Sequence, residues 1–222
     1  MKLSKATIDI LKNFSQINPS IMLNKGSFIM TKSINSVIYA EAEIPDVIDE
    51  DIGIYDLNSF LNQVNLVGAD ADIVHNVQSG EIVIKADRVK IVERSADAST
   101  IVKPKKRIQM PVADLIFQIS SQNFEKLIKA ARTMRLTDIS VEAVDGKLII
   151  TAKNKEAANS FAIEVGEYDG TNVFNFDMKI DNLLFLNSDY KVEISSKGAA
   201  KFTSESSGVS YVVVLESTSS FQ

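Results

Sequence analysis

The chain has 222 residues, of which 45% are hydrophobic and 24% are charged, a composition typical of a globular protein with its own core. It has no cysteine and one histidine, which excludes disulfides, thiolate metal sites and histidine-based metal sites within one chain. Its net charge of −5 argues against general adhesion to nucleic acid, and no apolar run reaches the roughly 20 residues that cross a bilayer. We therefore expect no metal, no cofactor and no membrane partner.

The first predicted element is a helix from Ser4 to about Phe14, because apolar residues recur there at helical spacing and Ser4 is a suitable N-cap. Asn18-Pro19 should end it. The strands predicted next are Ser20–Leu23, Phe28–Thr31 and Val37–Ile44. The first two should form a hairpin, and Pro45 should end the third.

A second helix is predicted over Asp56–Val67, with Asp56 as its cap and an outer face of uncharged amide and hydroxyl side chains. The strands predicted after it are Ile73–Val77, Ile82–Lys85 and Val89–Glu93. From Ser95 to Pro111 the pattern breaks into a segment with two prolines, which we interpret as a linker. The basic residues of this segment are Lys103, Lys105, Lys106 and Arg107, which we interpret as a solvated loop.

The second half follows the same plan. A third helix is predicted over Ser120–Met134, and a fourth, shorter helix should begin at Asp177, with Asp177 as its cap. The predicted strands of this half are Ile139–Ala143, Lys147–Ala152, Ser160–Val165, Lys191–Ser195, Ala199–Thr203 and Ser210–Glu216. A turn-rich connection, Gly166–Asn175, should precede the fourth helix.

Each of the four helices is thus followed by strands that turn at or beside a glycine: Gly26, Gly80, Gly146 and Gly198. Internal repetition of this kind decides the fold class before any single residue can. The pattern predicts an α+β protein of two tandem, similar domains, each made of two helix-plus-strands units. We place the N-terminal domain at 1–97, the linker at 98–111 and the C-terminal domain at 112–222.

Positive charge gathers on the outward faces of two helices in corresponding repeats. Lys5 and Lys12 lie opposite the apolar stripe of the first helix, and Lys126, Lys129 and Arg132 lie opposite or beside that of the third. Lysines on one helix face usually mean no more than solvation. Two such faces in matching repeats favour a surface that attracts the phosphate backbone without reading bases, because no base-reading motif is present.

Enzymatic interpretations find little support in the sequence. There is no Walker A loop and no dinucleotide fingerprint, and His75 lies in an alternating strand, where a structural role is favoured. The acidic stretch before the second helix suits a helix N-terminus better than a cation site. We predict no catalytic residues.

The chain resembles the DNA polymerase sliding clamps, most closely those of T-even-like bacteriophages, within the superfamily of PCNA and the beta clamp. The resemblance covers nearly the whole length and rests on collinear segments rather than on one motif. Those segments are KLSKATIDILKNF (Lys2–Phe14), IYDLNSFL (Ile54–Leu61), STIVKP and IQMPV on either side of the basic cluster, YDGTNVFNFDM (Tyr168–Met178) and VSYVVVLES (Val209–Ser217). The basic cluster is a departure, since the relatives are less basic there.

The resemblance implies a sliding-clamp fold, with helices lining a ring and sheets outside. Twelve helix-bearing units close such a ring, so four units per chain imply a homotrimer around double-stranded DNA. The implied function is processivity: the ring tethers the replicative DNA polymerase and slides without sequence specificity. The implied partners are DNA, the polymerase, an ATP-dependent clamp loader and the chain itself, in the cytoplasm of an infected bacterial host.

The resemblance also implies where partners bind. DNA would face the five cations of the first and third helices. Partner peptides would meet the linker at Ile101, Val102, Ile108, Met110 and Pro111, with Val213 and Leu215 from the terminal strand; the same residues could merely anchor the linker. Subunits would join through edge strands, with Val89 and Ile91 facing Phe161 and Ile163 of the next copy.

Two alternatives stay open at this point. A strand-rich structural phage protein would assemble without DNA and would have no peptide site. A monomeric, charge-based DNA-binding processivity factor would need strong positive charge on one face, and five or six cations on a chain of net charge −5 are few for that purpose.

Overall fold

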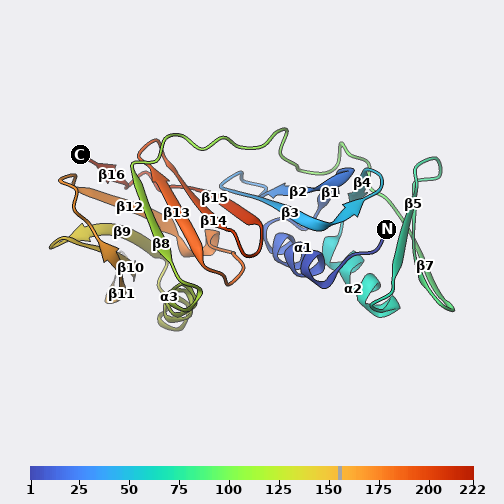
Figure 1. Cartoon of the computed structure of the whole chain (residues 1–222), viewed down its shortest axis with the longest axis horizontal. Helices are drawn as coiled ribbons and strands as arrows, with labels where there is room; N and C mark the ends of the chain where they lie inside the picture. Colours follow the sequence, from blue (N-terminus) through green and yellow to red (C-terminus); the bar gives the residue numbers. More distant parts are fainter. Residues whose placement is uncertain (155–156) are drawn as a thin grey trace. The chain divides into compact units, whose positions relative to one another are not determined.

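The computed structural model describes residues 1–154 and 157–222, which form two compact units, Met1–Arg107 and Ile108–Gln222. The division falls inside the segment interpreted as a linker, while the exact domain bounds stay a prediction. Each unit is described by itself below (Figure 1). None of the helices in the described ranges has the length and apolar character needed to span a membrane.

The first unit contains two α-helices, α1 (Lys5–Ile17) and α2 (Leu57–Val67). Its strands are β1 (Ile21–Leu23), β2 (Gly26–Lys32), β3 (Ile38–Ile48), β4 (Ile52–Ile54), β5 (Asp72–Asn76), β6 (Glu81–Ala86) and β7 (Val89–Arg94). All pairings are antiparallel: β1 pairs with β4, β2 with β3, and β5, β6 and β7 form one sheet in that order.

Both helices of this unit begin where the sequence predicts. The Ser4 hydroxyl accepts the backbone N–H of Thr7 at 3.3 Å, and the Asp56 carboxylate accepts that of Ser59 at 2.9 Å, so each cap satisfies a helix N–H that has no partner inside the helix. The helix α1 extends one turn beyond the predicted end, because its buried stripe continues to Ile17 before Asn18 stops it.

Two strand predictions for this unit are wrong. The segments around Asn24–Ser27 do not form a hairpin, since β1 pairs with the distant β4 and β2 pairs with β3. Pro45 does not end the third strand, which continues to Ile48. The ladder shifts register between Gly26 and Phe28, opposite the stretch that holds the proline, and a strand tolerates a residue without an N–H at such an irregularity.

The second unit contains α3 (Ser121–Met134), capped by Ser120, which accepts the N–H of Asn123 at 3.3 Å. Its strands are β8 (Leu115–Ile119), β9 (Asp138–Val144), β10 (Lys147–Asn154), β11 (Ala157–Glu167), β12 (Phe174–Lys179), β13 (Tyr190–Ser195), β14 (Ala199–Ser204), β15 (Val209–Val214) and β16 (Ser220–Phe221). Antiparallel pairing orders them as β11-β10-β9-β12-β16 and as β8-β13-β14-β15. The strands β8, β12 and β16 were not predicted.

The turn between β9 and β10 matches the strongest hairpin signal in the sequence. Asp145 and Gly146 both have positive φ, 51° and 76°, which is the backbone that a two-residue hairpin with the right twist requires. This turn aligns Ile139 and Val141 with Ala152 and Ile150, and all four side chains are buried.

The predicted fourth helix is wrong. Asp177 lies in β12 and caps nothing; its buried carboxylate accepts the hydroxyls of Ser140 and Thr218. Burial alone would raise the pKa of Asp177, but these hydrogen bonds outweigh it and lower the pKa below its ordinary value. Only a 3-10 turn, η1 (Ile180–Asn182), follows, so the described residues contain three α-helices.

Aromatic packing explains why the chain after η1 does not form an α-helix. The ring of Phe185 stacks on Tyr211, with centroids 4.2 Å apart, and lies 4.9 Å from Phe202 and 6.0 Å from Phe124. The Tyr211 hydroxyl also accepts the N–H of Leu186 at 3.2 Å. These contacts override local helix propensity, as tertiary packing often does.

Candidate nucleic-acid interface

The helix α1 presents its two predicted cations to solvent. Lys5 and Lys12 are exposed on the face away from the buried Leu11 and Phe14, with the exposed Asp9 between them. In the part of the chain that the structure describes, neither lysine forms an ion pair. Both ammonium groups are therefore available to a ligand outside the unit.

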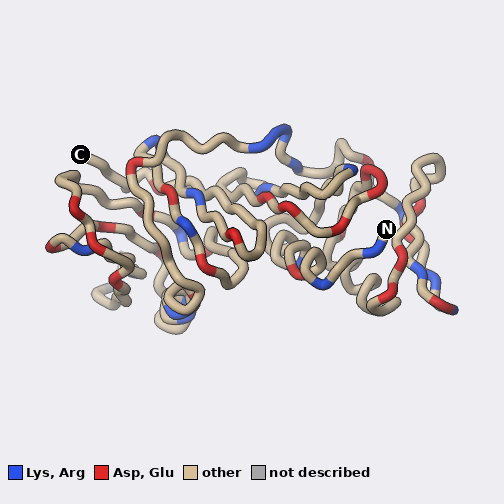
Figure 2. The backbone as a smooth tube through the Cα atoms, viewed as in Figure 1, with Lys and Arg blue, Asp and Glu red and all other residues tan. Residues whose placement is uncertain are grey.

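The helix α3 presents a denser cationic face. Positively charged residues mark α3 in blue in Figure 2. Lys126, Lys129 and Arg132 are all exposed, while Phe124 and Leu127 of the same helix are buried. None of the three cations is ion-paired with any described residue. Arg132 also lies in the last turn, where the helix dipole favours positive charge.

The helix α2 has no charge beyond its cap. Asn58, Asn62 and Asn65 are exposed on its outer face, and Asn58 accepts the hydroxyl of Ser15 on α1 at 2.8 Å. Gln63 donates instead to Glu93 of β7 at 2.9 Å. The α1–α2 pair therefore combines a sparse cationic face with an uncharged amide face.

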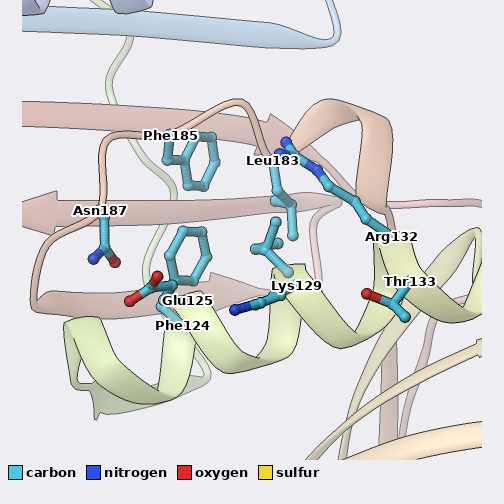
Figure 3. A pocket seen from close by; sticks show the side chains of 9 residues that line it. Phe124, Glu125, Lys129, Arg132, Thr133, Leu183, Phe185 and Asn187 are labelled. Atoms are coloured by element: carbon cyan, nitrogen blue, oxygen red, sulfur yellow. The ribbon is translucent and has the colours of Figure 1, made fainter.

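A hollow of about 410 Å³ lies beside α3 in the second unit (Figure 3). Its apolar lining comes from Phe124 and Ile128 on α3 and from Leu183 and Phe185 after η1. The polar residues that line it are Glu125, Lys129, Arg132, Thr133 and Asn187. Two of the five predicted DNA-facing cations thus border an apolar hollow, which the sequence pattern did not reveal because a helix was expected there.

Lys105, Lys106 and Arg107 of the basic linker segment are exposed, as expected of a solvated loop, but Arg107 also makes specific contacts. The guanidinium of Arg107 donates two hydrogen bonds to the buried carboxylate of Glu41, at 2.7 and 3.1 Å, and lies 4.4 Å from the ring centroid of Phe28. The Tyr39 hydroxyl donates to the same carboxylate at 2.6 Å. Lys105 and Lys106 remain exposed without ion pairs among the described residues.

The predicted peptide-binding residues fall in both units. In the first, Ile101 is buried and Val102 is 39% exposed. The backbone carbonyl of Val102 accepts a hydrogen bond from the side-chain amide of Asn18 at 2.8 Å. In the second, Ile108 is 47% exposed, and Met110 and Pro111 are half-buried. The last two predicted members are Val213, which has no exposed surface, and Leu215, which is buried. Because Val213 has no exposed surface, it cannot touch a bound peptide.

The predicted subunit contacts lie on strands that end their sheets. The strand β7 pairs only with β6 in its sheet, and β11 only with β10. Val89 is 48% exposed, and Ile91, Phe161 and Ile163 are half-buried. Each edge therefore offers backbone N–H and C=O groups and apolar side chains, and the pairing of the two edges stays a prediction.

The geometry of the described residues gives no support for a metal site. Across residues 1–154 and 157–222, no group of three or more His, Asp or Glu side chains is placed to hold a metal ion. His75 bonds through Nε2 to the Ser95 hydroxyl at 3.2 Å, a contact inside the β5–β7 region.

Two family models together match most of the chain. The model described as "DNA polymerase processivity factor" matches residues 2–103, and the one described as "gp45 sliding clamp, C terminal" matches residues 116–217. Three curated relatives are each named sliding clamp. Those of Escherichia phage RB69 and Enterobacteria phage T4 are 42% and 40% identical, over 99% of this chain and 98% of theirs. That of Vibrio phage KVP40 is 31% identical, over 91% of this chain and 94% of its own length.

Solved structures share the fold at low sequence identity. The structure described as "C-terminal region of FEN-1 bound to A. fulgidus PCNA" superposes with a TM-score of 0.72 at 16% identity, covering 94% of each chain. The DNA polymerase III subunit beta from Pseudomonas aeruginosa gives a TM-score of 0.66 at 11% identity, covering 96% of this chain and 63% of that one. The predicted fold class and the resemblance to sliding clamps are both confirmed.

Proposed function

The chain belongs to the sliding-clamp family of DNA polymerase processivity factors, and on this premise we propose that it forms a homotrimeric ring that encircles duplex DNA. The ring slides without sequence specificity and tethers the replicative polymerase. It has no catalytic role of its own, and a separate ATP-dependent clamp loader opens it. Since the relatives come from phages, it acts in the cytoplasm of an infected bacterial host.

The observation that carries this proposal is the placement of free cations in an acidic protein. The chain has a net charge of −5, yet five exposed cations on α1 and α3 have no ion-pair partner among the described residues. Three copies would place fifteen such charges around the hole. They attract phosphates without fixing a base sequence, while the negative remainder keeps the outer surface away from DNA.

Subunit closure is proposed through the two sheet edges. The strand β7 of one chain would pair with β11 of the next, so that Val89 and Ile91 meet Phe161 and Ile163. Such a head-to-tail contact uses two different surfaces, and it closes into a ring when the rotation between copies divides a full turn. Pairing would also cover two edges that otherwise invite aggregation.

Partner peptides from the polymerase and the loader are proposed to bind at the linker. In the second unit, accessible apolar surface comes from Ile108, Met110 and Pro111, while Val213 and Leu215 are buried. In the first unit, Val102 is exposed and Ile101 is buried. An apolar surface with few polar groups suits short peptides that bind and leave quickly.

Molar mass by light scattering across a dilution series tests the ring first. A trimer would have a mass of about 73 kDa, three times the chain mass of 24.4 kDa, and should be retained on nicked circular DNA but slide off linear DNA. A monomer at every concentration would remove the topological mechanism and favour charge-based binding. Assembly with equal retention on circular and linear DNA would instead favour a structural phage protein.

A further inference from the structure

We propose that the hollow beside α3 is a second peptide-binding site, which takes a bulky apolar side chain next to a carboxylate from an acidic segment of a protein partner. The site lies wholly within the second unit and is separate from the linker residues. Its existence does not depend on ring formation. Only its competition with DNA rests on the proposed function.

The floor of the hollow fits an apolar side chain. Phe124 and Phe185 have nearly parallel rings, 8° apart, and Leu183 lies between Phe185 and Arg132 (Figure 3). Ile128 adds further aliphatic surface to the lining. A volume of about 410 Å³ falls within the range of about 300–1,000 Å³ seen for small-ligand sites. A mixed aromatic and aliphatic floor of this size suits one or two large apolar side chains.

The rim gives the site a polarity along its length. Glu125 and Asn187 lie at one end and Arg132 and Thr133 at the other, with Lys129 on the same helix (Figure 3). Neither Lys129 nor Arg132 has an ion-pair partner among the described residues, so both can accept a new anion. The guanidinium can hold a carboxylate with two parallel hydrogen bonds.

This arrangement favours a peptide over a nucleic acid. The bases of a duplex are stacked inside it, so a phosphate backbone would leave the apolar floor empty. The carboxylate of Glu125 would repel a second phosphate, whereas it would accept backbone N–H groups of a peptide. A peptide running from Glu125 toward Arg132 satisfies both ends and fills the floor.

The site shares Lys129 and Arg132 with the proposed DNA-facing surface. Peptide and encircled DNA should therefore compete for these two cations. A partner bound there would engage the protein before DNA enters or after DNA leaves.

The test is a fluorescence anisotropy titration of the full chain, without DNA, against fluorescein-Gly-Gly-Phe-Leu-Asp with a free C-terminal carboxylate. We expect saturable binding that weakens at least about tenfold in Arg132→Gln, because a charged hydrogen bond is lost. Binding should weaken about tenfold in Ile128→Ser, because apolar burial is lost. If Ile128→Ser folds poorly, Asn187→Trp serves as a second variant, because residue 187 is exposed and a tryptophan there would fill the hollow. It should weaken peptide binding by the same factor.

Two matched controls separate this site from its neighbours. Lys126→Gln removes the same charge from α3 outside the hollow, and Met110→Ser alters the linker; each should change peptide affinity less than twofold. The proposal is overturned by no saturable binding, by loss of binding in Met110→Ser alone, or by a single-stranded oligonucleotide that binds through Ile128 when the peptide does not. These readings are made without DNA, so a monomeric protein would refute the ring but leave this test intact.

Discussion

At the scale of single residues, Arg107 ties the linker to a buried carboxylate. Its guanidinium holds both oxygens of Glu41 and covers the Phe28 ring, and the charge and hydrogen bonds of Glu41 raise the pKa of Arg107. Glu41 is buried in β3. Removing Arg107 would take the cationic partner away from a buried carboxylate, which lowers the stability of the folded state. The linker is thus fixed at the residue just before Ile108.

Arg107→Ala should lower the free energy of unfolding by about 1–2 kcal/mol, less than for a fully buried pair because the guanidinium is largely exposed to screening. Urea denaturation followed by circular dichroism measures this change. Lys106→Ala removes a neighbouring exposed cation and should be nearly neutral. Equal effects of the two substitutions would contradict a specific role for the Arg107–Glu41 pair.

At the scale of elements, the start of α1 is tied to the end of β3 by one carboxylate. Asp46 accepts the backbone N–H and hydroxyl of Ser4, at 2.7 and 2.8 Å, and the hydroxyl of Thr7 at 2.5 Å. Burial alone would raise the pKa of Asp46, but these hydrogen bonds outweigh it and lower the pKa below 3.8. The ionised form is therefore the one that the folded state favours.

Because the folded-state pKa is lowered, Asp46 contributes stability above the unfolded value of 3.8 and loses it as the pH falls through the folded value. Asp46→Asn should therefore be less stable than the parent at pH 7, and the gap should narrow below about pH 4. Urea unfolding at pH 7 and pH 3 compares the two. A gap that stays constant with pH would assign the effect to packing instead.

Helix starts were predictable because they depend on local chemistry. Ser4 and Asp56 each precede an apolar stripe and form the expected caps, and Ser120 caps the third helix one residue before its first turn. The same reasoning failed at Asp177, where the carboxylate bonds to Ser140 from a distant strand. A partner on a distant strand leaves no trace in the local sequence pattern. The sequence therefore could not predict that the fourth helix is missing or that a hollow lies in its place.

Strand partners were less predictable than strands. The alternating segments of β5, β6 and β7 pair in chain order, as a meander does. The pairing of β1 with β4 spans two intervening strands, and its side chains are buried throughout, so no alternation marks it. Of the candidate site, the exposed cations followed from helical periodicity, whereas the Arg107–Glu41 contact required the folded sheet.

At the scale of the whole molecule, the proposed ring holds DNA through many weak contacts. Replacing Lys126, Lys129 and Arg132 with glutamine should lower retention on circular DNA and flatten its dependence on salt, while the trimer mass stays unchanged. Retention on nicked plasmid across a salt series measures this. A control variant with glutamine at three exposed lysines outside the helices α1 and α3, Lys25, Lys85 and Lys197, should retain DNA like the parent. Equal losses would locate the DNA contact elsewhere.

The uncharged outer face of α2 bears on how fast such a ring could diffuse. A ring that slides along DNA must break one set of contacts before it forms the next. The free energy lost between the two sets is the barrier to each step of its diffusion. An exposed ion pair contributes about 0–1 kcal/mol, close to the thermal energy of about 0.6 kcal/mol. The amides of Asn62 and Asn65 can exchange partners with water, and like Asn58 they add no fixed charge to the outer face of α2. Barriers this low would let thermal motion alone carry the ring along the duplex.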